Sequence, residues 1–169
     1  MNTSDDVIDQ IVPLSAGQST YAVRHERAKV VASTQGSYEA MFSSAVAGIS
    51  VTERLLVALH ACRLSNADSL ATHYRAQLVS SHADRSLIDV VDSMASQTNF
   101  DARLKTILHF TSTLILRPLE GDKQAIDALV AAGLSTPAIV ALGQLIAFLS
   151  YQIRMTAGLQ AMAALEQTA

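Results

Sequence analysis

Three polar residues near the middle of the sequence have a spacing that redox proteins use. Asn66, Ser69 and His73 stand at offsets of zero, three and seven residues. At the start of a helix, two cysteines and a histidine at these offsets share one face and form a dithiol beside an imidazole. Asparagine and serine form neither a thiolate nor a disulfide. The sequence therefore predicts a scaffold that lacks dithiol peroxidase chemistry.

Cys62 is the only cysteine, and it precedes Asn66 by one helical turn. A reactive thiol needs an electropositive and partly exposed setting, which the neighbouring Arg54, His60 and Arg63 could supply. Cys62 also falls on the apolar stripe of its expected helix, and buried cysteines are common. We therefore favour an inert core residue over a reactive thiol.

Ser69 and His73 are four residues apart, which allows a hydrogen bond between their side chains on one helix face. His73 could then transfer protons or bind a ligand, and the alternative is that it fills the interior of a helical hairpin. A nucleophilic serine also needs an orienting group and oxyanion donors, which the sequence does not show. We therefore do not favour a serine hydrolase.

Two further groups of polar residues have weaker patterns. The histidines His60, His73, His82 and His109 lack the tight spacing of metal ligands, so we predict no metal site and no cofactor. Tyr151, Gln152 and Arg154 interrupt an apolar stretch. Arg154 could bind a carboxylate or phosphate, but a buried structural ion pair or a subunit contact is favoured.

Composition indicates that helices position these residues. Half of the 169 residues are hydrophobic, and only seven glycines and three prolines occur, which favours an all-α fold. We expect an N-terminal arm over residues 1–20, with at most a short helix over residues 6–12, and a single domain over residues 21–169.

Caps and apolar periodicity predict the individual helices. Ser50 and Glu53 form a capping-box pattern before a helix over residues 51–64, and a second helix over residues 67–80 completes a hairpin. Gly36 and Ser37 should break an earlier amphipathic helix over residues 21–33. Further helices are expected over residues 84–94 (starting at Asp84 or Ser86), 102–116 (capped by Asn99 or Asp101), 122–132 and 135–164.

Charge and hydropathy bear on partners and location. The net charge of −3 argues against nucleic acid as a main partner. No secretory signal is visible, so cytoplasm is the default location. The apolar stretch 138–151 is interrupted by Gln144 and falls short of a membrane span of roughly 20 residues. We expect a buried core helix and no membrane insertion.

Four segments carry a family resemblance. They are the hairpin from Ser50 to His73, the run LKTILHF at residues 104–110 through LRP at 116–118, the run LVAAGLSTPAIV at 129–140, and the run IAFLSYQIRMTAGL at 146–159. Together they resemble the carboxymuconolactone decarboxylase and alkylhydroperoxidase D superfamily, and in particular its peroxidase-related branch. The resemblance covers roughly residues 35–162, the usual extent of one domain.

The resemblance implies an all-α domain with a central helical hairpin, assembled as a dimer, trimer or hexamer. It places Asn66 at the resolving cysteine, Ser69 at the peroxidatic cysteine and His73 at the proton-relay histidine. The family's glutamate falls on Arg54, and Glu53 lies one residue away, which is about 100° of helix rotation.

Three functions follow as alternatives. The first is a binding or accessory protein, degenerate for dithiol peroxidase activity, that forms a homo-oligomer and partners a cysteine-containing relative. The second is an enzyme that acts on a small molecule by acid–base chemistry through His73. The third is a peroxidase or antioxidant enzyme that uses Cys62. Whether the protein is an enzyme stays open at the level of the sequence.

Overall fold

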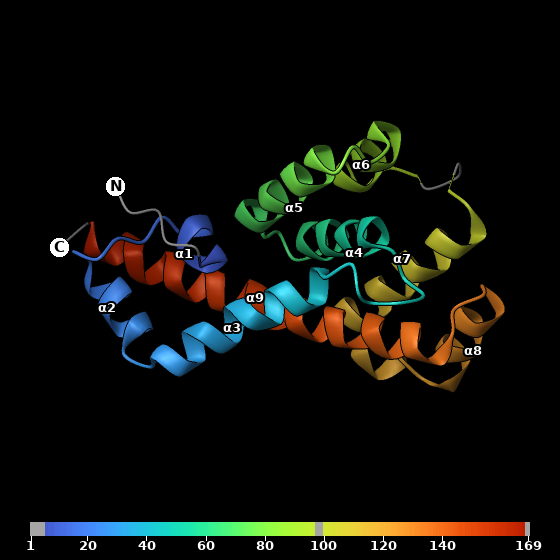
Figure 1. The fold of residues 1–169 in the computed structure, drawn as a ribbon. Coiled ribbons are helices and arrows are strands. Elements are labelled where there is room, and N and C mark those ends of the chain that lie inside the picture. The colour runs from blue at the N-terminus through green and yellow to red at the C-terminus, as the bar shows by residue number, and fades with distance from the viewer. Residues whose placement is uncertain (1–5, 97–99, 168–169) are drawn as a thin grey trace.

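The computed structural model describes residues 6–96 and 100–167, and these residues form helices and no strands. The predicted all-α class, with a central hairpin and a long C-terminal helix, is confirmed (Figure 1). The elements in chain order are α1 (Val7–Ile11), α2 (Ser19–His25), α3 (Ala28–Phe42), α4 (Val51–Leu64), α5 (Asp68–Ser80), α6 (Arg85–Asp92), α7 (Ala102–Leu116), the 3₁₀ helix η1 (Pro118–Glu120), α8 (Lys123–Ala131) and α9 (Thr136–Glu166).

Helix α4 is the centre of the molecule. The capping box before it is formed as predicted: Ser50 Oγ accepts from the Glu53 amide at 3.1 Å, and Glu53 Oε2 accepts from the Ser50 amide at 2.7 Å. Every residue from 54 to 62 is buried, because α5, α6, α7 and α9 all pack against this helix. Such all-round burial makes α4 the framework on which the other helices are positioned.

The turn between α4 and α5 depends on a left-handed residue. Asn66 has a φ of 53°, and the amide of Ala67 donates to the carbonyl of Cys62 at 2.9 Å. This pairing closes the C-terminal end of α4, and asparagine tolerates the left-handed region better than most residues do. Asn66 therefore has a conformational role of its own in the hairpin.

Local caps also define the later helices as expected. Asp84, Asp101 and Asp122 accept hydrogen bonds from amides at the starts of α6, α7 and α8. Gly133 has a φ of 85° after α8, the conformation that favours glycine at a helix end. The alternative cap at Asn99 lies outside the described residues.

The predicted position of the interruption between the N-terminal helices is wrong. The interruption falls at Glu26 and Arg27, between α2 and α3, and α3 continues through Gly36 and Ser37 to Phe42. A glycine inside a helix costs only about 1 kcal/mol relative to alanine. Tyr38, Met41 and Phe42 pack against the main core beyond it, and this packing outweighs that cost.

Helix α9 runs along the length of the molecule (Figure 1). Its first half lies in the main core, and its second half meets α1, α2 and α3. By length and composition α9 could cross a membrane, with a mean hydropathy of 1.4 over its most apolar window, although 44% of that window is buried in the structure. The expectation that the apolar segment is too short to span a membrane is therefore wrong. One such helix is weak evidence, because core helices pass the same test.

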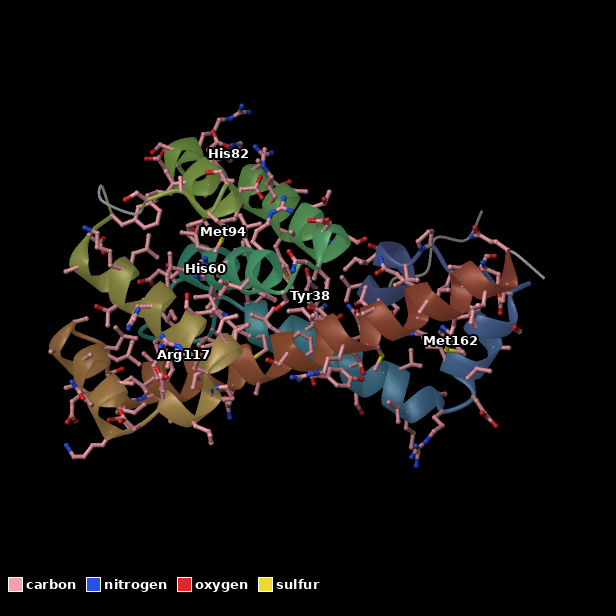
Figure 2. The ribbon with its side chains drawn as sticks, turned by 180° about the vertical axis from the view of Figure 1, so that it is seen from behind. Tyr38, His60, His82, Met94, Arg117 and Met162 are labelled. Carbon is pink, nitrogen blue, oxygen red and sulfur yellow. The ribbon has the colours of Figure 1, made fainter. Side chains whose placement is uncertain are left out.

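The N-terminal segment is fixed to α9 by a second, smaller core. Val7, Ile8 and Val12 are buried together with Leu159. The described part of the expected arm does contain a short helix, α1, within residues 6–12. Figure 2 shows how far apart the two regions lie: Tyr38 and His60 are near the middle of the molecule, whereas Met162 is near the end of α9.

Candidate functional site

The relay position of the hairpin, His73, bonds to an aromatic residue that the sequence did not reveal as its partner. His73 Nε2 lies 2.9 Å from the hydroxyl of Tyr38, which comes from α3. Burial lowers the pKa of His73 and raises the pKa of Tyr38. The pair is therefore an uncharged imidazole and an uncharged phenol near neutral pH.

Ser69 and Asn66 face α9 instead of His73. Ser69 Oγ accepts a hydrogen bond from Gln160 Nε2 at 2.8 Å, so the hydrogen bond to His73 that the spacing allows is not formed. Asn66 and Ser69 line a small pocket of about 250 Å³ together with Thr156 and Gln160. Neither His73 nor Cys62 lines this pocket, so the motif is divided between two places.

Cys62 lies in the main core with none of its surface exposed. Burial raises the pKa of its thiol to about 12, and the nearby positive charge of Arg63 offsets only part of that effect. The expectation of a buried cysteine is confirmed. Because the thiolate is the nucleophilic form, this environment does not support thiol chemistry at neutral pH.

Glu53 and Arg54 are both committed to structural contacts. Besides capping α4, Glu53 accepts from Arg103 Nε of α7 at 2.7 Å. Burial raises the pKa of Glu53, but the hydrogen bonds from Arg103 and Ser50 outweigh it, and the pKa is lowered overall. Arg54 is 1% exposed and donates to the carbonyls of Met41, Ser43 and Ser50. The structure therefore does not join a carboxylate from α4 to His73.

The polar residues of α9 serve separate contacts. Gln152 is buried and accepts from the Tyr74 hydroxyl at 2.5 Å, whereas the hydroxyl of Tyr151 lies 3.0 Å from Thr34 Oγ1. Arg154 is exposed, and among the described residues its side chain donates to the carbonyl of Ser150 at 3.3 Å. The buried ion pair of Arg154 is therefore not formed, and a subunit contact of this exposed side chain stays a prediction.

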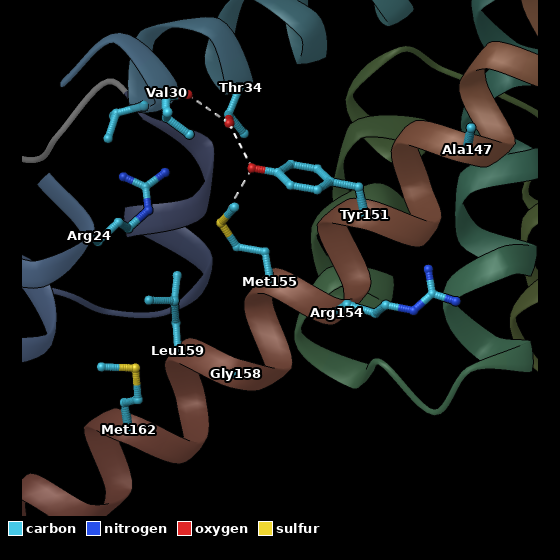
Figure 3. A pocket seen from close by; sticks show the side chains of 11 residues that line it. Arg24, Val30, Thr34, Ala147, Tyr151, Arg154, Met155, Gly158, Leu159 and Met162 are labelled. Carbon is cyan, nitrogen blue, oxygen red and sulfur yellow. Dashed lines mark hydrogen bonds between the residues drawn. The ribbon is translucent and has the colours of Figure 1, made fainter. Parts of the chain in front are cut away.

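Within the described residues, no group of three or more His, Cys, Asp or Glu side chains is arranged to hold a metal ion. A wide pocket with a volume of about 650 Å³ lies away from the hairpin, between α2, α3 and α9 (Figure 3). Sequence reasoning missed it because its walls come from segments more than a hundred residues apart.

Comparison with known proteins identifies the fold. No protein-family model matches the sequence, and no curated protein sequence matches it. The structure is similar to the crystal structure of a cysteine-to-alanine variant of the debrominase Bmp8 in complex with 2,3,4-tribromopyrrole. The TM-score is 0.71 at 14% sequence identity, over 90% of this chain and 79% of the debrominase chain. The two proteins therefore share a helical fold.

Proposed function

We propose that this protein is a carboxymuconolactone decarboxylase/alkylhydroperoxidase D-like protein that has lost dithiol peroxidase activity and acts as an oligomeric binding or accessory protein. One observation carries the proposal: the chain's only thiol, Cys62, is fully buried with its pKa raised to about 12. The two positions where the resemblance implies cysteines are occupied by Asn66 and Ser69.

The fold likeness supports the superfamily, and the hydrogen bonds support the loss of activity. A debrominase with this fold was crystallised with a small halogenated pyrrole, so the fold can accommodate a small ring compound. In this chain His73 is paired with Tyr38, Ser69 with Gln160, and Glu53 with Arg103. These three candidate residues therefore have stabilising contacts that do not require a substrate.

Exposed apolar residues support assembly with a second copy or with a relative that retains its cysteines. Leu116, Leu119, Val130 and Val140 are all more than half exposed, and they lie on the adjoining elements α7, η1, α8 and α9. Exposed apolar side chains of this kind are available for contacts with another protein chain. Light scattering on the purified protein would measure the mass of the oligomer and so test this assembly directly.

Acid–base catalysis through His73 is supported less well. A neutral imidazole is a competent base at neutral pH. His73, however, lines neither the pocket at Asn66 and Ser69 nor the wider pocket against α9. Its Nε2 atom is also occupied by the Tyr38 hydroxyl.

The test combines turnover with thiol labelling. We expect no consumption of an organic hydroperoxide with a dithiol reductant beyond that of the Cys62→Ser variant, which serves as the matched control. We also expect Cys62 to react with a thiol reagent only after unfolding, because the native thiol is buried and protonated. Hydroperoxide turnover that disappears in Cys62→Ser would contradict the proposal, as would rapid labelling of the native protein.

A further inference from the structure

The pocket between α2, α3 and α9 has the size and lining of a small-molecule site. Its volume of about 650 Å³ falls within the range of known ligand pockets. Most of its wall is apolar and comes from α3 and α9: Val30, Val31, Met155, Leu159 and Met162. Methionine side chains adapt easily to the shape of an apolar ligand. The pocket is separate from the hairpin, so its role does not depend on whether thiol chemistry is lost.

One buried donor in this wall lacks an acceptor among the residues that the structure describes. The side chain of Arg24 is 4% exposed, and its two terminal nitrogens pair with Asp6 and Asp9 at 2.8 and 2.9 Å. Its Nε atom is buried, and no residue in the described part of the chain accepts a hydrogen bond from it. Figure 3 shows the Arg24 side chain at the edge of the pocket, across from Met155 and Leu159. A buried donor without an acceptor is unfavourable, and a ligand acceptor would satisfy it.

The charges around Arg24 determine what kind of ligand fits. The carboxylates of Asp6 and Asp9 already neutralise the guanidinium of Arg24. The carboxylate of Asp9 also lies 2.9 Å from Nε2 of His25. A second anion beside these carboxylates would be repelled. Arg154 also borders the pocket, but Figure 3 shows its side chain extending away from Val30 and Met155. The site therefore favours an uncharged molecule.

We propose that this pocket binds a neutral, largely apolar small molecule with one hydrogen-bond acceptor, which takes the Nε–H of Arg24. The apolar body of the ligand contacts the side chains of α3 and α9. The hydroxyl of Tyr151, held 3.0 Å from Thr34 Oγ1, closes the wall on the side nearest the main core. This arrangement of an apolar cavity with few polar groups is typical of ligand sites.

Two glycines of α9 provide a matched pair of variants. Gly158 lines the pocket, and Gly143 lies on the same helix outside it; a Cβ at either position would meet no heavy atom within 4 Å. Leucine has a higher helix propensity than glycine, so both Gly158→Leu and Gly143→Leu should fold. Only Gly158→Leu fills the pocket. Val30→Trp, from the opposite wall, is a second filling variant, and thermal unfolding checks that each protein is folded.

The probe is prodan, a neutral naphthalene ketone whose fluorescence shifts to the blue in apolar surroundings. We expect saturable binding of one prodan to the full-length protein, weakened about tenfold or more in Gly158→Leu and unchanged in Gly143→Leu. The naphthalene without the ketone should bind more weakly than prodan, and Arg24→Lys should remove that difference. An anionic naphthalene sulfonate dye should also bind more weakly than prodan.

Three results would overturn the proposal. The first is prodan binding that is absent, or equal in the parent and in both filling variants. The second is tighter binding of the sulfonate dye than of prodan. The third is an oligomer whose mass falls in Gly158→Leu while neither dye binds, because a second copy of the chain would then cover the pocket.

Discussion

At the scale of single residues, His60 shows how burial alone changes the chemistry of a side chain. It lies on α4, is 3% exposed, and its Nε2 atom is 2.8 Å from Ser112 Oγ of α7. The serine hydroxyl donates to the carbonyl of Leu108 at 3.0 Å, so it accepts from His60 Nε2–H. His60 Nδ1 is buried and has no hydrogen-bond partner within residues 6–96 and 100–167. Burial lowers the pKa of His60 from 6.5 to about 4.

This lowered pKa predicts a loss of stability on acidification. Below pH 6.5 the unfolded chain binds a proton at His60 that the folded chain does not, so the free energy of unfolding falls as the pH drops toward the folded pKa. Between pH 7.5 and 5.5 we expect His60 to account for a loss of about 1 kcal/mol in urea unfolding. His73 acts in the same direction, because its pKa is lowered as well.

One substitution separates the contribution of His60 from that of His73. His60→Gln removes the titration of the buried imidazole and should reduce the pH dependence of the unfolding free energy by the same amount, while the part due to His73 remains. A magnetic resonance titration that gives His60 an ordinary pKa near 6.5 would disprove the argument.

Residue roles could be predicted only where the determining contact is local in the chain. The Ser50–Glu53 capping box and the burial of Cys62 follow from neighbouring residues, and both are confirmed. The Tyr38–His73 hydrogen bond joins residues 35 apart, and the sequence pattern contains no trace of it. The same applies to Arg24, whose role depends on Asp6 and Asp9 folding back onto it.

At the scale of elements, the last helix caps the second one. The residue before α2, Gln18, makes no side-chain capping hydrogen bond. Instead Glu166, at the end of α9, accepts from the amide of Thr20 at 2.5 Å, from Thr20 Oγ1 at 2.9 Å and from Ser19 Oγ. A carboxylate at a helix N-terminus stabilises the unpaired amides there. This contact joins the start of α2 to the end of α9.

We therefore expect Glu166→Ala to loosen α2 without disturbing the hairpin. Hydrogen exchange of the amides in residues 19–25 should quicken, and that of residues 51–64 should not change. Hydrogen bonds from Ser19 and Thr20 lower the pKa of Glu166, so this contribution is present above the ordinary carboxyl pKa and is lost as the pH falls through the lowered value. Glu120→Ala, an exposed carboxylate paired with Arg117, is the control. Equal effects of both variants on α2 would contradict the capping role.

Helix boundaries could likewise be predicted where neighbouring residues determine them, and not where distant contacts do. Helices α4, α7 and α8 begin where Ser50, Asp101 and Asp122 provide caps, so their starts could be predicted. The break between α2 and α3 could not, because it has no glycine or proline and depends on how both helices pack against α9. Left-handed residues at His82 and Met94 end α5 and α6 without the glycine that marks the end of α8.

At the scale of the whole molecule, two cores of unequal size share α9. The main core unites α4 to α9, whereas the second consists of Val7, Ile8, Val12 and Leu159 with a few partly buried neighbours. A small core with few buried side chains opens more readily than a large one. The wider pocket lies beside this second core, so its walls belong to the less stable part of the molecule.

A pair of matched substitutions tests this division. Ile8 and Ile107 are both fully buried, the first in the second core and the second in the main core. Truncation of a buried isoleucine to alanine costs about 2–5 kcal/mol where the whole structure depends on it. We expect Ile107→Ala to lower the free energy of global unfolding by that amount. Ile8→Ala should instead speed hydrogen exchange in α1 and α2 and leave α4 and α5 protected. It should also weaken prodan binding, because Asp6 and Asp9 lie on either side of Ile8 and position Arg24 in the pocket wall. Equal loss of protection in α4 for both variants would mean that the two cores unfold as one.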